Sequence, residues 1–264
     1  PVIMGVINLT EDSFYSGSRI VETDAIITRM KEMEAAGAEV IDLGAMSSRP
    51  GAAISSPERE LELLMPVLQD LPADLDVIVS IDTIHSKVAR GCLDKGAHII
   101  NDITAGHFDE KMVPTVVENE AAFIAMHMRG MPEDMKSKTQ YEKGVSAEVL
   151  SYLINRIRKL RSAGLHDLVI DPGFGFAKTI GQNFRLLKDL SSFNVLDCPL
   201  LVGISRKSMI WKTLEISPDE ALNGTTAVHM LALNNGADIL RVHDVKEATE
   251  CVKIWKSYSE PDDL

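Results

Sequence analysis

The first strong signal in the chain is the run VIMGVIN at residues 2–8, which carries no polar side chain before its last position, Asn8. Uninterrupted apolar runs of this length are typical of strands in parallel sheets, because helices cover both faces of such a sheet. Seven further runs of this kind follow, at residues 39–45, 77–82, 98–103, 122–127, 168–173, 200–205 and 238–243. They begin about 20 to 45 residues apart, which is the length of one strand–helix unit.

Eight strand–helix units in 264 residues fit a (β/α)8 TIM barrel, an α/β fold that typically needs about 250 residues. We predict one domain over residues 1–264, because no linker interrupts the repeat. An open, doubly wound sheet is the alternative fold. Such a sheet usually carries a glycine-rich turn after its first strand, and this chain has none there.

Helix boundaries can be read between these runs. Thr23 is a candidate N-cap for a helix that ends at the Ala36–Gly37 pair. The order Ser56–Pro57–Glu58 predicts a cap, a proline in the first turn and an acidic first turn. An amphipathic stretch at residues 146–163 predicts a helix that ends at Gly164.

Composition excludes some classes of partner. The net charge is -12, from 27 basic and 39 acidic residues, so we expect no broad surface for nucleic acid or for an anionic membrane. No apolar run reaches the roughly 18 residues that a membrane span needs. Cys92, Cys198 and Cys251 lie far apart and form no CxxC pair, and the first strand lacks the features of a signal peptide. We therefore predict a cytoplasmic protein with reduced thiols.

The carboxyl ends of the expected strands carry the candidate active-site residues, because active sites of TIM barrels lie at that end of the barrel. Every one of these strands ends in a polar or charged residue. In chain order they are Asn8, Asp42, Asp82, Asn101 with Asp102, His127, Asp171, Ser205, and Arg241 with His243.

Part of this ring suits a polar heterocycle. Asp82, Asn101 and Asp171 supply carboxylates and an amide, and carboxylates accept hydrogen bonds from ring N–H and amino groups. These three residues therefore predict a site that reads the donor–acceptor edge of such a ring.

A second, basic set suits phosphate. Arg49, Lys207, Arg241 and His243 lie at strand ends or in the loops that follow them. Arginine binds phosphate through two parallel hydrogen bonds, and lysine adds a point charge. Asn8 can offer a carbonyl oxygen to Mg²⁺, which usually bridges substrate phosphates. In an acidic protein, this cluster predicts a phosphorylated or pyrophosphorylated small molecule.

The loop GFGFAKT at residues 173–179 resembles a phosphate-binding loop but does not match one. A P-loop needs four residues between its glycines and a glycine directly before the lysine, whereas Ala177 precedes Lys178 here. We expect Phe174 to pack beneath this loop. Phe176 suits packing and an apolar wall for a flat substrate equally well.

Met126, His127 and Met128 could form a soft metal-binding triplet. Side chains alternate along a strand, so His127 faces away from both methionines. Met126 is therefore expected in the core or in the wall of the substrate pocket.

Taken together, these motifs resemble those of the dihydropteroate synthase family, the folate-pathway enzymes that sulfonamides target. The matching segments are MGVINLTEDSF (4–14), IDLGAMSSRPGA (41–52), SIDT (80–83), INDI (100–103), MHM (126–128), DPGFGFAKT (171–179), GISRKS (203–208) and RVHDV (241–245). RPG, DPGFGF and SRKS in that order are highly specific. The resemblance implies a (β/α)8 barrel, usually a homodimer.

The resemblance also implies substrates and roles. The family joins p-aminobenzoate to a pterin pyrophosphate, with Mg²⁺, and releases pyrophosphate. By this likeness the pterin would be held by Asp82, Asn101, Asp171 and Lys207, with Met126 in the pocket wall and Arg241 flanking the ring. The pyrophosphate and Mg²⁺ would be bound by Asn8, Ser48, Arg49 and His243, with Asn8 as the metal ligand. The p-aminobenzoate site would be framed by Pro50, Phe176, Ser205 and Lys207. The expected catalytic residues are Asp82, Asp171, Lys207 and Arg241.

The chain departs from the family pattern at a few positions. Glu11 replaces a usual proline, Ser48 a common threonine and Ala177 a common glycine, while Ser16 stands where the family's first loop carries an acid. Two other functions stay open at this point. One is a pterin-binding methyltransferase or corrinoid-protein partner, which would not need SRKS or RPG. The other is a catalytically silent barrel that binds a pterin or regulates a partner.

Overall fold

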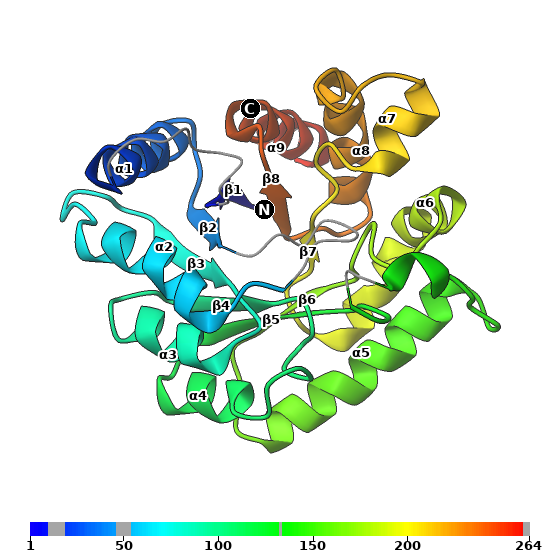
Figure 1. The fold of residues 1–264 in the computed structure, drawn as a ribbon. Coiled ribbons are helices and arrows are strands. Elements are labelled where there is room, and N and C mark those ends of the chain that lie inside the picture. Colours follow the sequence, from blue (N-terminus) through cyan, green and yellow to red (C-terminus); the bar gives the residue numbers. More distant parts are fainter. Residues whose placement is uncertain (10–18, 46–53, 132–133, 261–264) are drawn as a thin grey trace.

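The computed structural model describes residues 1–9, 19–45, 54–131 and 134–260, and within them eight parallel strands form a barrel (Figure 1). The strands are β1 (Val2–Asn8), β2 (Val40–Gly44), β3 (Ile78–Asp82), β4 (Ile99–Asp102), β5 (Ala122–Met126), β6 (Leu168–Asp171), β7 (Leu201–Val202) and β8 (Ile239–Val242). They are ordered β6-β5-β4-β3-β2-β1-β8-β7, and a parallel bridge from Ile170 to Leu200 joins the two edges. The predicted TIM barrel is confirmed, and the open doubly wound sheet is excluded.

Helices surround the strands and follow them in turn (Figure 1). They are α1 (Arg19–Ala35), α2 (Pro57–Gln69), α3 (Ser86–Leu93), α4 (Met112–Glu118), α5 (Val145–Ser162), α6 (Ile180–Lys188), α7 (Ser208–Leu214), α8 (Leu222–Asn234) and α9 (Val245–Ser259), with short 3-10 helices η2 (Met135–Ser137) and η3 (Leu190–Leu196). Within the described ranges, no helix has the length and apolar character needed to cross a membrane.

The predicted helix boundaries are correct except at Thr23, and α1 ends at Ala35, directly before the Ala36–Gly37 pair. Ser56 caps α2, because its Oγ accepts a hydrogen bond from the backbone N–H of Arg59, and Pro57 is the first residue of the helix. α5 ends before Gly164, which has a φ of +94°. The prediction that Thr23 caps α1 is wrong, because α1 begins at Arg19 and Thr23 is a buried residue inside it. A cap-type residue within a helix gives the same sequence signal as a true cap.

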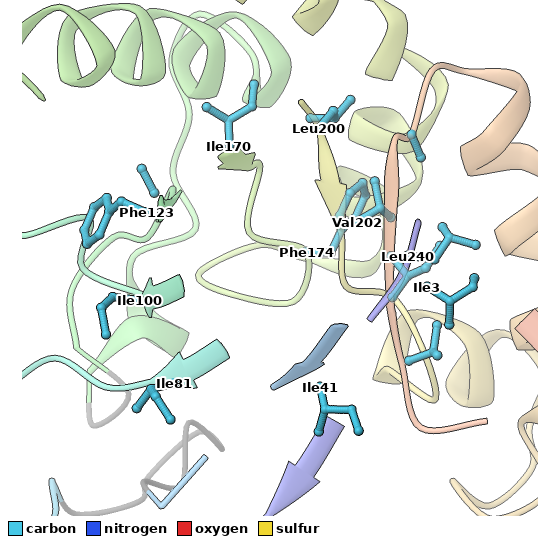
Figure 2. Close-up of a cluster of buried hydrophobic side chains, with 14 of the residues drawn as sticks. Ile3, Ile41, Ile81, Ile100, Phe123, Ile170, Phe174, Leu200, Val202 and Leu240 are labelled. Atoms are coloured by element: carbon cyan, nitrogen blue, oxygen red, sulfur yellow. The ribbon is translucent and has the colours of Figure 1, made fainter. Parts of the chain in front are cut away.

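The main core lies between the strands and the helices. Figure 2 shows one side chain of this core from each strand: Ile3, Ile41, Ile81, Ile100, Phe123, Ile170, Val202 and Leu240. Each of them is at most 2% exposed, and they belong to one cluster with apolar side chains of the surrounding helices. Because strand side chains alternate, their sequence neighbours face the barrel axis.

Inside the barrel, the lowest layer is apolar and the layers above it are polar. Met4, Val40, Ile124 and Leu201 form a small buried cluster of their own. Two residues further along β2 the inward position is Asp42, which is fully buried. The inward side chains toward the carboxyl ends of the strands therefore build the candidate active site on an apolar floor.

Candidate active site

Asp42 is the centre of the polar layer inside the barrel. Its Oδ1 accepts a hydrogen bond from Ser80 Oγ at 2.7 Å, and its Oδ2 accepts from Asn101 Nδ2 at 3.0 Å. Arg241 of β8 donates to the same Oδ2 through Nε at 2.7 Å. The residue is inaccessible to solvent, and its partners come from three other strands. Asp42 thus fixes the position of both the Arg241 guanidinium and the Asn101 amide.

Asp82 shares Arg241 with Asp42. Arg241 Nη2 lies 3.0 Å from Asp82 Oδ2, while Asp82 Oδ1 is buried and has no hydrogen-bond partner among the described residues. Burial raises the pKa of Asp82 to about 7, against the attraction of Arg241. An unpaired buried acceptor is costly, so Oδ1 is suited to accept from a donor on a ligand.

Asp171 ends β6, and Lys207 lies in the loop after β7, the strand next to β6 in the closed barrel. Asp171 Oδ1 accepts from the Gly173 N–H at 2.7 Å, and burial raises the pKa of this carboxyl although Lys207 attracts its charged form. Burial lowers the pKa of Lys207 to about 8, and its Nζ donates to the carbonyl of Phe174. Gly175, at a φ of +84°, makes room for the Lys207 stem, since a Cβ there would lie 3.2 Å from Lys207 Cδ.

Ser205 and His243 form the rim beside Lys207. Ser205 Oγ lies 3.0 Å from His243 Nδ1 and accepts from the His243 backbone N–H at 3.2 Å. His243 is exposed at the mouth. Partial desolvation, together with the positive charge of Arg241, lowers its pKa, so the imidazole is neutral at pH 7.

Met126 and Phe176 form an apolar wall. Both are buried and belong to one small cluster with Ile84 and Ile103. Lys207 Nζ lies 4.9 Å from the centroid of the Phe176 ring, so this ring borders the polar site. Phe174 is fully buried in the main core, as predicted.

Asp102 and His127 do not belong to the mouth, although both stand at strand ends. Asp102 accepts from Thr104 and from the Gly106 N–H, and so shapes its own loop. The His127 ring packs edge-on against Tyr152 of α5, with centroids 4.9 Å apart. Both residues follow inward-facing neighbours, and alternation turns them toward the helices. The expectation that every strand end contributes to one ring is wrong at these two positions.

Lys178 closes the loop that carries Phe176. Its Nζ donates to the carbonyls of Gly173 at 2.7 Å and Phe176 at 3.1 Å, and lies 3.2 Å from His127 Nδ1. Burial lowers the pKa of Lys178 to about 7. The Lys178 ammonium thus binds backbone carbonyls of its own loop. This contact agrees with the prediction that the loop is not a P-loop.

Asn8 ends β1 and is exposed. Asn8 Oδ1 and Asp82 Oδ2 each lie 3.7 Å from the point that a Cβ on Gly44 would occupy, so Gly44 leaves room between them. Across the part of the chain that the structure describes, no three His, Cys, Asp or Glu side chains gather as a metal site. Predicted residues Ser48, Arg49 and Pro50 lie outside the described residues, as do Glu11 and Ser16.

The structure brings together most of the predicted set that it describes, and it adds a role for one strand-end residue to which sequence reasoning assigned none. Asp82, Asn101, Asp171, Lys207 and Arg241 meet inside the barrel, with Met126, Phe176, Ser205 and His243 around them and Asn8 at the β1 end. Asp42 is the addition. Its signal is an ionisable residue between Ile41 and Leu43 in an otherwise apolar strand.

Comparisons with known proteins agree with this geometry. Residues 4–243 match the family described as "Pterin binding enzyme". Dihydropteroate synthase of Escherichia coli K12 is 40% identical over 256 residues, which cover 96% of this chain and 90% of that protein. Dihydropteroate synthase of Yersinia pestis in complex with a sulfonamide drug superposes with a TM-score of 0.92 at 35% identity, covering 98% and 94% of the two chains. The Xanthomonas albilineans enzyme in complex with 7,8-dihydropteroate has a TM-score of 0.86 at 31% identity, covering 98% and 94%.

Proposed function

The chain belongs to the family of pterin-binding enzymes, and from that membership we propose that it catalyses the dihydropteroate synthase reaction of folate biosynthesis. It is a transferase that joins 6-hydroxymethyl-7,8-dihydropterin pyrophosphate to p-aminobenzoate and releases pyrophosphate. The observation that carries this function is the buried carboxylate of Asp82, which shares Arg241 with Asp42 and has one oxygen without a partner among the described residues. A pterin offers ring N–H and amino donors to such an acceptor.

The pterin would lie on the polar layer of the barrel. Asp82 and Asp171 would accept hydrogen bonds from the N–H and amino donors of the pterin. Asn101 would contact the same polar edge of the ring, in an orientation that its amide hydrogen bond to Asp42 fixes. Lys207 would donate to an acceptor on the ring. Met126 would cover one face of the ring as part of the apolar wall.

The pyrophosphate would lie at the rim above the pterin. Arg241 and Lys207 bring positive charge there, while Ser205 and neutral His243 offer hydrogen bonds. By family likeness, Ser48 and Arg49 would join them. Leaving-group charge is the main barrier to breaking the C–O bond, so preorganised cations and donors lower it.

We infer a Mg²⁺ ion bound through Asn8 and substrate phosphate. Mg²⁺ usually takes one or two protein oxygens and fills its other positions with phosphate oxygens and water. Asn8 fits this role, because it is exposed and its Oδ1 lies on the same side of Gly44 as Asp82 Oδ2, each 3.7 Å from the point that a Cβ on Gly44 would occupy. When bound, the ion would neutralise part of the pyrophosphate charge.

The chemical step follows from these positions. The bond between the pterin methylene carbon and the pyrophosphate oxygen breaks, and its electron pair leaves with the pyrophosphate. Asp82 and Asp171 stabilise the positive charge that the pterin then shares. The amine nitrogen of p-aminobenzoate forms the new bond to the methylene carbon and loses one proton to solvent. Pro50, Phe176, Ser205 and Lys207 would hold this acceptor in place, and no strong general base is required.

We also propose a homodimer in the cytoplasm. Val195 of η3, Leu214 of α7 and Leu231 of α8 are all about half exposed or more. α7 packs against α8, and η3, α7 and α8 each pack against α6. Apolar side chains grouped on one face are typical of an interface. The three cysteines are all free thiols, which suits a reducing compartment.

A turnover assay tests the function. The purified protein with the pterin pyrophosphate, p-aminobenzoate and Mg²⁺ should form dihydropteroate and one equivalent of pyrophosphate. Transfer of a methyl group from a methylated pterin, with no product from p-aminobenzoate, would favour the methyltransferase instead. Pterin binding without any turnover would indicate a silent barrel.

A further inference from the structure

The loops that follow β7 and β8 are joined by two successive residue pairs. Ser205 pairs with His243, as described above. The next residue in each loop forms the second pair, in which Arg206 donates to Asp244 through Nε and Nη2, each 2.8 Å from a different carboxylate oxygen. Lys207 directly follows this pair in the first loop. The two-pronged pair therefore lies one residue from Lys207 and one from His243.

Asp244 is placed for this pair rather than for its helix. It occupies the N-cap position of α9, where an aspartate usually accepts a hydrogen bond from an N–H of the first helical turn. Here its side chain caps nothing, and both oxygens accept from Arg206 instead. A bidentate arginine–carboxylate pair fixes orientation as well as distance.

Arg206 is held from three sides in an unusual backbone conformation. Its φ is +52°, a region that residues other than glycine rarely adopt. Its N–H donates to Thr225 Oγ1 of α8 at 3.1 Å, and its Nη1 donates to the carbonyls of Asp219 at 2.8 Å and Pro218 at 3.2 Å. These contacts hold the residue between the α7–α8 turn and Asp244. Surrounding contacts of this kind are what allow a strained residue to persist at a functional site.

We propose that Arg206 is a positioning residue for the pyrophosphate end of the substrate. Through Asp244 it fixes the loop that carries Ser205 and Lys207 against the loop that carries His243. The guanidinium itself binds Asp244 and the α7–α8 turn, so it acts through its neighbours and not on the substrate. The inference rests on the proposed function, because that function places the pyrophosphate beside Ser205 and His243.

Two variants test the pair, Arg206→Lys and Asp244→Asn, with Arg185→Lys as the matched control. Arg185 forms an arginine–aspartate pair with Asp189 at 2.6 Å, but on α6, outside the barrel mouth. Calorimetry would measure two ligands: inorganic pyrophosphate with Mg²⁺, and 6-hydroxymethyl-7,8-dihydropterin, which lacks the phosphates. Both test variants should bind pyrophosphate about tenfold more weakly, the scale of one charge-assisted hydrogen bond, and should bind the pterin within about twofold of wild type. The control should match wild type for both ligands.

A second readout, which like the calorimetry needs no turnover, is the state of the His243 ring. The ¹⁵N NMR signals of the His243 ring report its hydrogen bond to Ser205, and they should shift in both test variants but not in the control. A purely structural role would lower the thermal midpoint or the folded fraction without this pattern. Folded variants with wild-type pyrophosphate affinity, or with equal loss of both ligands, would overturn the proposal. Should Asp244→Asn fail to fold, Arg206→Lys decides, because it keeps the positive charge while it removes the two-pronged pair and the Nη1 hydrogen bonds to the α7–α8 turn. If the wild-type protein makes no dihydropteroate, the proposed function is wrong. The affinities for pyrophosphate and for the pterin, together with the His243 signals, would still test the positioning role of Arg206.

Discussion

At the scale of single residues, the site depends on one arginine that serves two carboxylates. Arg241 Nη2 lies 2.6 Å from Asp42 Oδ2 and 3.0 Å from Asp82 Oδ2. Asp42 also accepts hydrogen bonds from Ser80 and Asn101. Within the ranges that the structure describes, Asp82 Oδ1 has no hydrogen-bond donor. The difference makes Asp42 a structural anchor and leaves Asp82 free to respond to a ligand.

Lys207→Ala should remove most activity and leave the fold intact. Its ammonium lies between Asp171 and the Phe176 ring, where it can contact both substrates. Loss of a charge-assisted hydrogen bond typically costs about 1.5–3 kcal/mol, which corresponds to a roughly tenfold to hundredfold fall in kcat/KM. Steady-state kinetics would measure the fall. The exposed Lys212, in the helix that follows, gives the matched control Lys212→Ala. Near wild-type turnover in Lys207→Ala would remove this lysine from the site.

Pterin binding should strengthen as the pH rises from 6 to 8. Burial raises the pKa of Asp82 to about 7, so in the empty site the folded protein binds this proton more readily than the unfolded chain does between about pH 4 and 7. A ligand that donates to the carboxylate must displace that proton, and its affinity should fall by up to about tenfold per pH unit below 7. Titration calorimetry with the pyrophosphate-free pterin would measure the slope. Asp82→Asn should bind weakly and without this dependence, and an equal slope in both proteins would assign it to another group.

At the scale of strands and helices, the sequence was sufficient for the architecture but not for the pairing of side chains. All eight strands lie where their apolar runs predicted them, because burial on both faces leaves a strong signal. β7 is only two residues long, against a predicted run of six, because strand length depends on hydrogen bonds to neighbouring strands. Alternation also separates Asn101, which faces the axis, from Asp102, which does not.

The sequence alone could not predict which charged residues pair when they lie far apart in the chain. Asp42 and Arg241 are 199 residues apart, and Arg206 and Asp244 are 38 apart. Their meeting depends on the register of the strands that carry them. A single sequence shows that each residue is charged, but not which partner neutralises it.

Removal of the Lys178 ammonium should destabilise the loop between β6 and α6. Lys178→Met would leave the carbonyls of Gly173 and Phe176 without their donor, at a cost of about 1–3 kcal/mol in the free energy of unfolding. Phe176 would then lose its fixed position, so the KM for p-aminobenzoate should rise more than the KM for the pterin substrate. Chemical denaturation and steady-state kinetics measure the two effects. Lys188→Met, at the far end of α6, is the control. Loss of stability with both KM values unchanged would limit Lys178 to a structural role.

At the scale of the whole molecule, an acidic net charge coexists with two cationic side chains at the barrel mouth. The net charge is -12, yet the groups at the mouth include Arg241 and Lys207, held in place by buried carboxylates. A net charge of this sign disfavours a broad contact with nucleic acid, while the two cations leave the mouth able to bind the pyrophosphate of the proposed substrate.

The outer helices should instead decide the oligomeric state. Val195, Leu214 and Leu231 are 72%, 49% and 50% exposed, on η3, α7 and α8. If these elements form the dimer face, light scattering should give twice the 29.0 kDa of one chain, and Leu231→Glu should give the monomer, because a charge in an apolar interface is left unpaired. Phe108→Glu is the control: it changes a 44% exposed aromatic before α4, and α4 lies across the barrel from α7 (Figure 1). Arg206 binds the turn between α7 and α8, so a monomeric Leu231→Glu should also bind pyrophosphate more weakly if the dimer supports that turn. A monomeric wild type, or a Leu231→Glu protein that remains dimeric, would place the interface elsewhere.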